Sequence, residues 1–150
     1  MSRMIFVNLP VTDLPRSVAF YEAVGATKNP QFSDDTAACM VLSDTIYVML
    51  LTHGKFATFT KRPVGDRSTV HALLCLSCES RDAVLSQLAA AVSAGGVPDP
   101  TPEQDYGFMY GRSYEDPDGH IWEVMWMDPA AAGDSAAQVN QTTQPAGAFA

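Results

Sequence analysis

The chain has 150 residues, with nine lysines and arginines against seventeen aspartates and glutamates, and a formal net charge of −8. This length fits one ordinary domain or two small fused halves, and it is enough to bury a conventional core. The acidic balance argues against nucleic acid and anionic membranes as partners, because both attract positively charged proteins. No apolar run approaches the roughly 18 residues of a membrane span. The first residues, MSRMIFVNLP, lack the features of a secretory signal, so we expect a cytoplasmic protein.

The three cysteines do not form the spaced framework of a disulfide-rich protein. Cys75 and Cys78 match the pattern C-x-x-C, but residues three apart in a strand point to opposite faces of the sheet. We therefore expect free thiols in a reduced compartment, and neither a zinc site nor a disulfide at this pair.

The first half of the chain begins with a strand and a helix. Residues 4–9 are apolar nearly throughout, which predicts a strand. Asp13 can cap the helix that follows, a proline fits its first turn, and Gly25 ends it. Three more strands are expected at residues 28–33, 38–42 and 45–52. The last two form a hairpin about a two-residue turn at Ser43 and Asp44.

The second half repeats this order of elements after an irregular stretch rich in turn residues. A strand is expected at residues 69–77, a capped helix at 80–94, a weak edge strand from Val97, and a hairpin of residues 107–115 and 120–127. The boundaries that follow are a first module at 1–55, a connector at 56–68, a second module at 69–128 and a flexible tail at 129–150. Each half is strand, helix and three strands, which predicts an α+β fold of two βαβββ modules.

The closing strand carries a carboxylate among apolar residues. Alternation puts three residues on each face: Trp122, Val124 and Trp126 on one, and Ile121, Glu123 and Met125 on the other. The tryptophan face suits a helix, which assigns Glu123 to the face away from the helices. An unpaired buried carboxylate costs several kcal/mol, so Glu123 is a candidate site residue.

The D-P-D-G sequence at residues 116–119 sets the register of this hairpin. It suits a type I turn followed by a left-handed Gly119, which is a three-residue loop with a bulge. That geometry places Ser113 opposite Glu123. Without the bulge, Arg112 would lie opposite Glu123 and form a cross-strand ion pair. The glycine favours the bulge.

Three stretches of the chain resemble a known family. They are VTDLPRSVAFYEAVGA after the first strand, the second helix ending in Gly-Gly, and the closing RSYEDPDGHIWEVMW. Over residues 3–128 the chain resembles the glyoxalase/bleomycin resistance/dioxygenase group, the vicinal oxygen chelate superfamily. The resemblance implies paired βαβββ modules whose curled mixed sheets form a cup, and a homodimer. It also implies that catalytic members hold a divalent metal on the cup wall.

The metal positions implied by the resemblance are mostly apolar in this chain. They fall on Phe6, Leu50, Leu73 and Glu123. One carboxylate does not make a tight site for a transition metal, so we expect no cofactor. A two-residue shift in the strand alignment would bring Asn8 and His71 onto the same face. A weakly bound divalent metal on His71 and Glu123 therefore stays open.

The expected function is to bind a small organic molecule in an apolar cup, as bleomycin-resistance-type members sequester basic antibiotics. The candidate pocket residues around Glu123 are Phe6, Asn8, Leu50, Leu73, Met109, Ser113 and Met125. Methionine side chains adapt to varied ligands, and the acidic balance would attract a cationic one. His53 and His120 are expected at the surface or against a helix.

An enzyme is the alternative. It would be a lyase, isomerase or dioxygenase in which Glu123 acts as metal ligand or as general base. Metal-free acid–base chemistry with Glu123 and Ser113 is a further variant of it.

Overall fold

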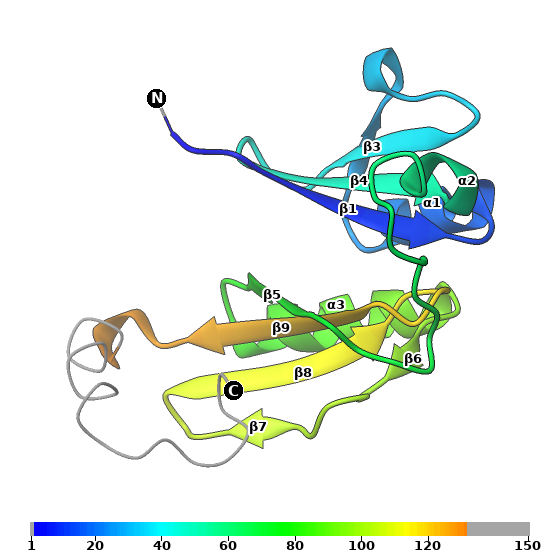
Figure 1. Ribbon diagram of the computed structural model, residues 1–150. Coiled ribbons are helices and arrows are strands. Elements are labelled where there is room, and N and C mark those ends of the chain that lie inside the picture. Colours follow the sequence, from blue (N-terminus) through cyan, green and yellow to red (C-terminus); the bar gives the residue numbers. More distant parts are fainter. Residues whose placement is uncertain (1, 132–150) are drawn as a thin grey trace.

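The computed structural model describes residues 2–131 and forms two mixed sheets with helices packed on them (Figure 1). The first half contains β1 (Ile5–Val11), α1 (Leu14–Ala23), β2 (Thr27–Asn29), a 3₁₀ turn (Pro30–Phe32), β3 (Ala37–Val41), β4 (Ile46–Thr52) and α2 (His53–Phe56). The second contains β5 (Leu73–Ser77), α3 (Arg81–Ser93), β6 (Val97–Pro98), β7 (Gln104–Asp105), β8 (Met109–Glu115) and β9 (Ile121–Met127). Of the tail expected at 129–150, residues 132–150 lie outside the described residues.

Each half of the chain makes one sheet, and the two sheets are built alike. The strand order is β1-β4-β3-β2 in the first sheet and β5-β9-β8-β6 in the second, with β7 added beside β8. The first strand of each half runs parallel to the last, and the remaining pairs are antiparallel. The predicted α+β fold of paired modules is confirmed, and the sheets are not closed. Within residues 2–131, every helix is too short or too polar to cross a bilayer.

The helices begin and end where the sequence predicts. The Asp13 side chain accepts a hydrogen bond from the first turn of α1, and Gly25 follows that helix with a φ of 105°. Ser80 caps α3 in the same way. Side-chain oxygens are favoured at these positions because they satisfy backbone N–H groups that have no partner within the helix.

One buried core joins the two modules. Helix α1 packs on β3 and β4, and α3 packs on β8 and β9. Phe20 and Tyr21 of α1 reach the second sheet, with ring centroids 6.0 Å from Tyr114 and 6.1 Å from Trp122 respectively. Aromatic pairs at such distances add to the stability that burial alone gives.

A buried hydrogen-bond network ties α1 to the D-P-D-G turn. Tyr21 Oη donates to Asp116 Oδ2 at 2.7 Å and accepts from Trp122 Nε1 at 2.9 Å. The other Asp116 oxygen accepts the backbone N–H groups of Asp118 and His120, both at 2.9 Å. Burial raises the pKa of the Asp116 carboxyl group. The helix motif and the turn motif that carried the family resemblance therefore hold each other in place.

The same turn is also fastened to the end of β1. Asp118 Oδ1 accepts from the backbone nitrogen and the hydroxyl of Thr12 at 2.9 and 2.7 Å, and Oδ2 accepts from Ser17 at 3.4 Å. His120 Nε2 donates to the Pro10 carbonyl at 2.8 Å, since a carbonyl oxygen can only accept. The two modules are therefore joined by specific contacts at this end.

Several boundaries differ from the sequence prediction. The strand expected at residues 28–33 ends at Asn29 and a 3₁₀ turn follows, because Pro30 has no N–H for the sheet and the Asn29 side chain accepts from the Gln31 nitrogen. The strand expected at 69–77 begins only at Leu73, because Leu73 already pairs with Ile121, the first residue of β9. The turn before β4 is longer than two residues, because the Ser43 hydroxyl accepts from the backbone nitrogens of Thr45 and Ile46 and holds a wider loop. Helix α2 and strand β7 lie in stretches where no regular element was expected.

Candidate functional site

Glu123 lies in the middle of β9, on the sheet face away from the helices, as predicted. It pairs with Cys75 of β5 on one side and with Ser113 of β8 on the other. Its side chain is half-buried. No hydrogen bond or ion pair reaches the Glu123 carboxylate from the described part of the chain.

The bulged turn produces this register. Gly119 has a φ of 86°, and its N–H donates to the Asp116 carbonyl at 3.0 Å. Any residue with a side chain is strained at such a φ, which explains the glycine. The alternative register is wrong, because Arg112 lies opposite Val124.

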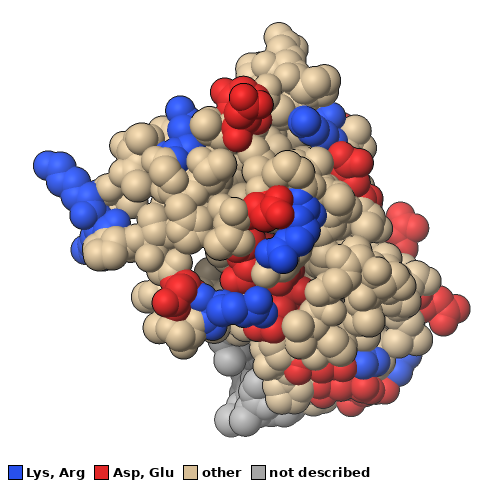
Figure 2. All heavy atoms as spheres, turned by 90° about the vertical axis from the view of Figure 1, so that its right-hand side faces the viewer, with Lys and Arg blue, Asp and Glu red and all other residues tan. Residues whose placement is uncertain are grey.

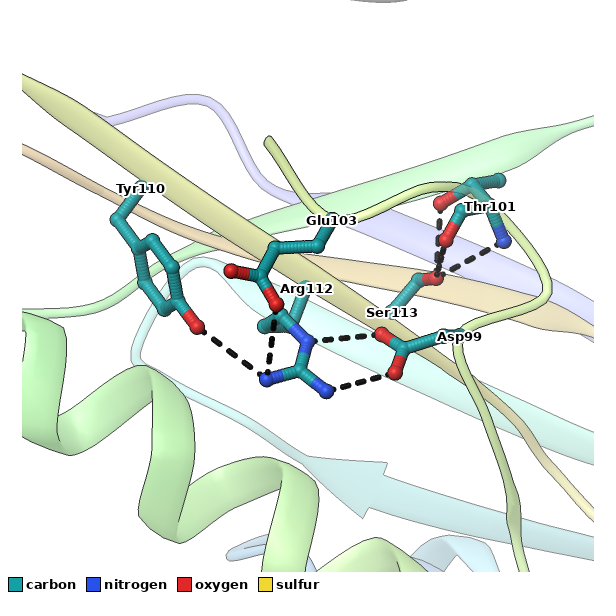
Figure 3. Close-up of polar contacts among 6 residues, drawn as sticks. All are labelled: Asp99, Thr101, Glu103, Tyr110, Arg112 and Ser113. Atoms are coloured by element: carbon teal, nitrogen blue, oxygen red, sulfur yellow. Dashed lines mark hydrogen bonds and ion pairs between the residues drawn. The ribbon is translucent and has the colours of Figure 1, made fainter. Parts of the chain in front are cut away.

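The Ser113 hydroxyl makes its hydrogen bonds to Thr101, in the segment before β8 (Figure 3). Its hydroxyl accepts from the nitrogen and the hydroxyl of Thr101 at 3.1 and 2.7 Å, and donates to the Thr101 carbonyl at 3.2 Å. The side chain is fully buried. A hydroxyl with all its hydrogen bonds made to Thr101 is unavailable as a partner for Glu123, so metal-free acid–base chemistry by this pair has no geometric support.

Arg112 fixes the same segment from the other face of β8 (Figure 3). Its guanidinium donates to both carboxylate oxygens of Asp99 at 2.9 and 2.6 Å, and lies 3.4 Å from Glu103. It also donates to the Tyr110 hydroxyl at 3.2 Å. The hydrogen bonds from Arg112 hold the pKa of Asp99 below its usual range. This bidentate pair secures the segment between α3 and β8, and does not face Glu123.

Cys75, the neighbour of Glu123, is not an activated nucleophile. Burial raises the pKa of its thiol to about 11, and the Glu123 carboxylate contributes in the same direction. Because the thiolate is the reactive form, the side chain stays protonated at neutral pH. Cys78 packs against the core, and the thiols of Cys39, Cys75 and Cys78 are all free. The two residues of the C-x-x-C pattern face opposite sides of the sheet, as predicted.

The donors around Glu123 do not fit a divalent metal. In the first sheet Asn8 lies beside Met49, and in the second sheet Cys75 is the one strand neighbour of Glu123 that could act as a second ligand. Leu50 lies in the core on the helix face, so the structure removes it from the candidate pocket. Nowhere in residues 2–131 do three His, Cys, Asp or Glu side chains come together as a metal site. The expectation of no cofactor stays a prediction.

His71 is not brought close to Glu123. It lies two residues before β5, whereas Glu123 pairs with Cys75, four residues further along. At about 3.3 Å per residue, this places them about 13 Å apart along the strand direction. The two side chains also line different cavities.

The expected cup residues do not enclose a cavity of useful size. Met109 and Met125 line a hollow beside Glu123 of only about 20 Å³, far below the several hundred Å³ of typical ligand sites. Phe6 and Leu73 lie on the edge strands β1 and β5, where they are 49% and 42% exposed.

In the first sheet, the residues on the face that was expected to line the cup pack against one another. Phe6 stacks on Tyr47 with ring centroids 4.7 Å apart. The Asn8 amide donates to the Phe6 carbonyl at 3.3 Å. These side chains therefore contact one another and do not meet the residues around Glu123.

A much larger cavity, of about 550 Å³, lies where the two modules meet. It is bounded by the end of β1, the start of α1, helix α2, residues 65–72 at the end of the connector and before β5, and the D-P-D-G turn. Its apolar lining comes from Leu9, Pro10, Phe56, Val70, Ala72, Leu74 and Ile121. We call it the junction cavity. Figure 2 views this end of the molecule, where acidic and basic side chains lie beside one another.

All three histidines of the chain line the junction cavity, which sequence reasoning did not anticipate. His53 and His71 flank the connector, and His120 follows the turn. Their places in the sequence could have predicted this, because they lie beside the connector and the D-P-D-G turn, and both of these segments lie where the modules meet. Arg16 and Arg67 also line it.

Comparison with known proteins identifies the family. A family model described as the Glyoxalase/Bleomycin resistance protein/Dioxygenase superfamily matches residues 3–124. The chain belongs to this superfamily. The match covers both modules of the glyoxalase-like fold, from β1 into β9.

Solved structures of other proteins share the fold. A hypothetical protein from S. aureus is 24% identical, over 84% of this chain and 95% of that chain, with a TM-score of 0.70. A superfamily enzyme from Burkholderia phytofirmans is 18% identical, over 84% and 99%, with a TM-score of 0.68. TnmS3, an antibiotic binding protein from Streptomyces, is 19% identical, over 85% and 97%, with a TM-score of 0.60. A comparison with curated proteins finds no match.

Proposed function

We propose that this chain binds a small organic molecule in the junction cavity, without a resident divalent metal. The observation that carries the proposal is the cavity itself, which has a volume of about 550 Å³ and largely apolar walls. Small-molecule sites typically have volumes of about 300–1,000 Å³ and a few polar groups that orient the ligand. Binding of an antibiotic by TnmS3, a protein of the same fold, supports this class of function.

The metal-free part of the proposal rests on donor chemistry. Glu123 is the carboxylate at the position that the family uses for metal, and its strand neighbours are Cys75 and Ser113. The second is a hydroxyl bound to Thr101, and the described residues contain no group of three His, Cys, Asp or Glu side chains that could hold a metal. Elemental analysis of the purified protein checks this part. Near-stoichiometric zinc, nickel, iron or manganese that survives gel filtration would overturn it.

Filling the junction cavity is expected to abolish binding. Ala72 is exposed and lines the cavity, so Ala72→Trp places an indole in the space for the ligand. Ala89→Trp is the matched control, because Ala89 is exposed on α3 and does not line the cavity. A thermal-shift screen with neutral, anionic and cationic small molecules supplies the ligands. We expect the molecules found in this screen to bind Ala72→Trp at least tenfold more weakly than the wild type. Their affinity for Ala89→Trp should equal that for the wild type.

Two results would contradict the proposed function. One is a screen without any stabilising molecule. The other is a set of hits whose affinity is equal in Ala72→Trp and in the wild type, since the ligand would then bind elsewhere.

We also propose a homodimer. The edge strands β1 and β5 leave apolar side chains open to solvent, with Ile5 55% and Phe6 49% exposed. Unpaired edges and exposed apolar patches are typical of protein interfaces. Gel filtration with light scattering checks this, and a mass near 16.1 kDa at micromolar concentration would contradict it.

A further inference from the structure

We infer that the ligand of the junction cavity is an organic anion, with an apolar body and a carboxylate or a similar group. The inference rests on the proposed function and names its ligand class. It comes from counting which polar groups of the lining already have partners.

The acidic groups of the lining are engaged by donors from the chain. Asp118 uses both carboxylate oxygens, accepting from Thr12 and from Ser17. Asp66 accepts from the backbone nitrogen and the hydroxyl of Ser68, and these hydrogen bonds lower the pKa of Asp66. Asp118 therefore has both oxygens engaged by the chain, while Asp66 is engaged through Oδ1.

Several basic groups of the lining have no such partners. Arg67 donates to the Pro117 carbonyl at 3.2 Å and lies 3.4 Å from Glu115, and His120 donates to Pro10. By contrast, the side chains of Arg16, His53 and His71 make no hydrogen bond or ion pair within the described part of the chain. They are therefore the donors that remain for a ligand.

The cavity differs in charge from the rest of the molecule. Its lining contains two arginines and two aspartates, so its formal charge is zero with neutral histidines, while the whole chain carries −8. Surface charges more than about 8 Å away are screened at physiological salt, so the lining decides which ligand is bound. The overall acidity of the chain is therefore no argument for a cationic ligand in this cavity.

Arg16 is exposed and lines the cavity, so its guanidinium is free to contact a carboxylate there. The guanidinium of Arg16 presents a planar fork of donors that matches the two oxygens of a carboxylate. The apolar walls lower the local dielectric constant and strengthen such a contact compared with open water. His53 and His71 also line the cavity and can add ring N–H donors.

Three bicyclic probes of similar shape test the inference: 2-naphthoate, its neutral amide 2-naphthamide, and the cation 2-naphthylmethylammonium. Isothermal titration calorimetry on the full chain at pH 7.5 measures each affinity. We expect naphthoate to bind at least tenfold more tightly than the amide, and the ammonium to bind more weakly than the amide. Stronger binding of the ammonium, or equal binding of all three, would overturn the inference.

Arg16→Gln identifies the group responsible. It should lower the affinity for naphthoate about tenfold and leave the affinity for naphthamide unchanged. Arg62→Gln removes the same charge from an exposed connector residue outside the lining, and should change neither affinity. His53→Gln combined with His71→Gln should lower the affinity for naphthoate a further few-fold. Equal effects of Arg16→Gln on both probes would contradict the assignment.

The outcomes separate the inference from the proposed function. Binding of all three probes with equal affinity, lost in Ala72→Trp, keeps the junction cavity as a ligand site and removes the anion preference. Failure of all three probes to bind refutes the anion inference. The screen described above then decides the proposed function on its own.

Discussion

Replacing Tyr21 with phenylalanine is expected to lower the free energy of unfolding by about 3 kcal/mol, because two buried hydrogen-bonding groups lose their partner at once. The Tyr21 hydroxyl donates to Asp116 and accepts from the indole of Trp122, and all three residues are buried. Without it, the Asp116 carboxylate keeps only backbone donors, and the indole N–H has no acceptor. Leaving a buried polar group unsatisfied costs about 1–3 kcal/mol, and more for a charged group.

Urea denaturation followed by tryptophan fluorescence measures this loss. Tyr47→Phe is the matched control, since it removes a hydroxyl that bonds the Asp44 carbonyl at an exposed site. We expect the control to cost less than about 1 kcal/mol. Equal stability losses in the two variants would show that the buried network contributes no more than an exposed hydrogen bond.

Gly96→Ala is expected to cost about 2–3 kcal/mol, because there is no room for a methyl group at this position. A Cβ there would lie 2.8 Å from the Glu115 carbonyl oxygen, 2.9 Å from the Ala91 carbonyl oxygen and 3.0 Å from the Phe20 ring. Two of these neighbours are backbone atoms, which cannot move without disturbing α3 or β8. The loss should appear as a lower denaturation midpoint with an unchanged slope.

Gly54→Ala provides the comparison for this prediction. Gly54 lies in the short helix α2, and a Cβ there meets no atom within 4 Å. Alanine should therefore stabilise the protein by up to about 1 kcal/mol, through its higher helix propensity. A destabilisation by Gly54→Ala as large as that by Gly96→Ala would show that loss of glycine itself, and not the contact, is responsible.

Much of the fold could be predicted because local chemistry determines it. The side chains of Asp13 and Ser80 cap the helices, and the D-P-D-G turn with its left-handed Gly119 places Ser113 opposite Glu123. The start of β5 could not be predicted in this way. Leu73 is its first residue only because β9 begins at Ile121, so the boundary depends on a strand 48 positions away in the sequence.

The candidate site was harder to predict, because sheet faces are sensitive to single-residue shifts. Strand β4, IYVMLLT, is apolar on both faces, so alternation does not show which residues face the helices. The sequence alignment placed Leu50 in the cup, but Leu50 lies in the core. Met49, one residue earlier, is on the opposite face of β4, so an error of one residue in the alignment exchanges the two faces. The junction cavity is built from four separate stretches of the chain, and no local pattern brings them together.

The D-P-D-G turn also restricts how the junction cavity can change during evolution. A Cβ at Gly119 would lie 2.6 Å from the Cβ of Arg67, so the turn packs directly on the connector. A substitution in the turn would alter hairpin register and cavity shape together. Thr69, Val70 and Ala72 line the same cavity, are exposed and lie outside the strands. This part of the cavity wall can therefore change its shape and polarity while the hairpin stays fixed.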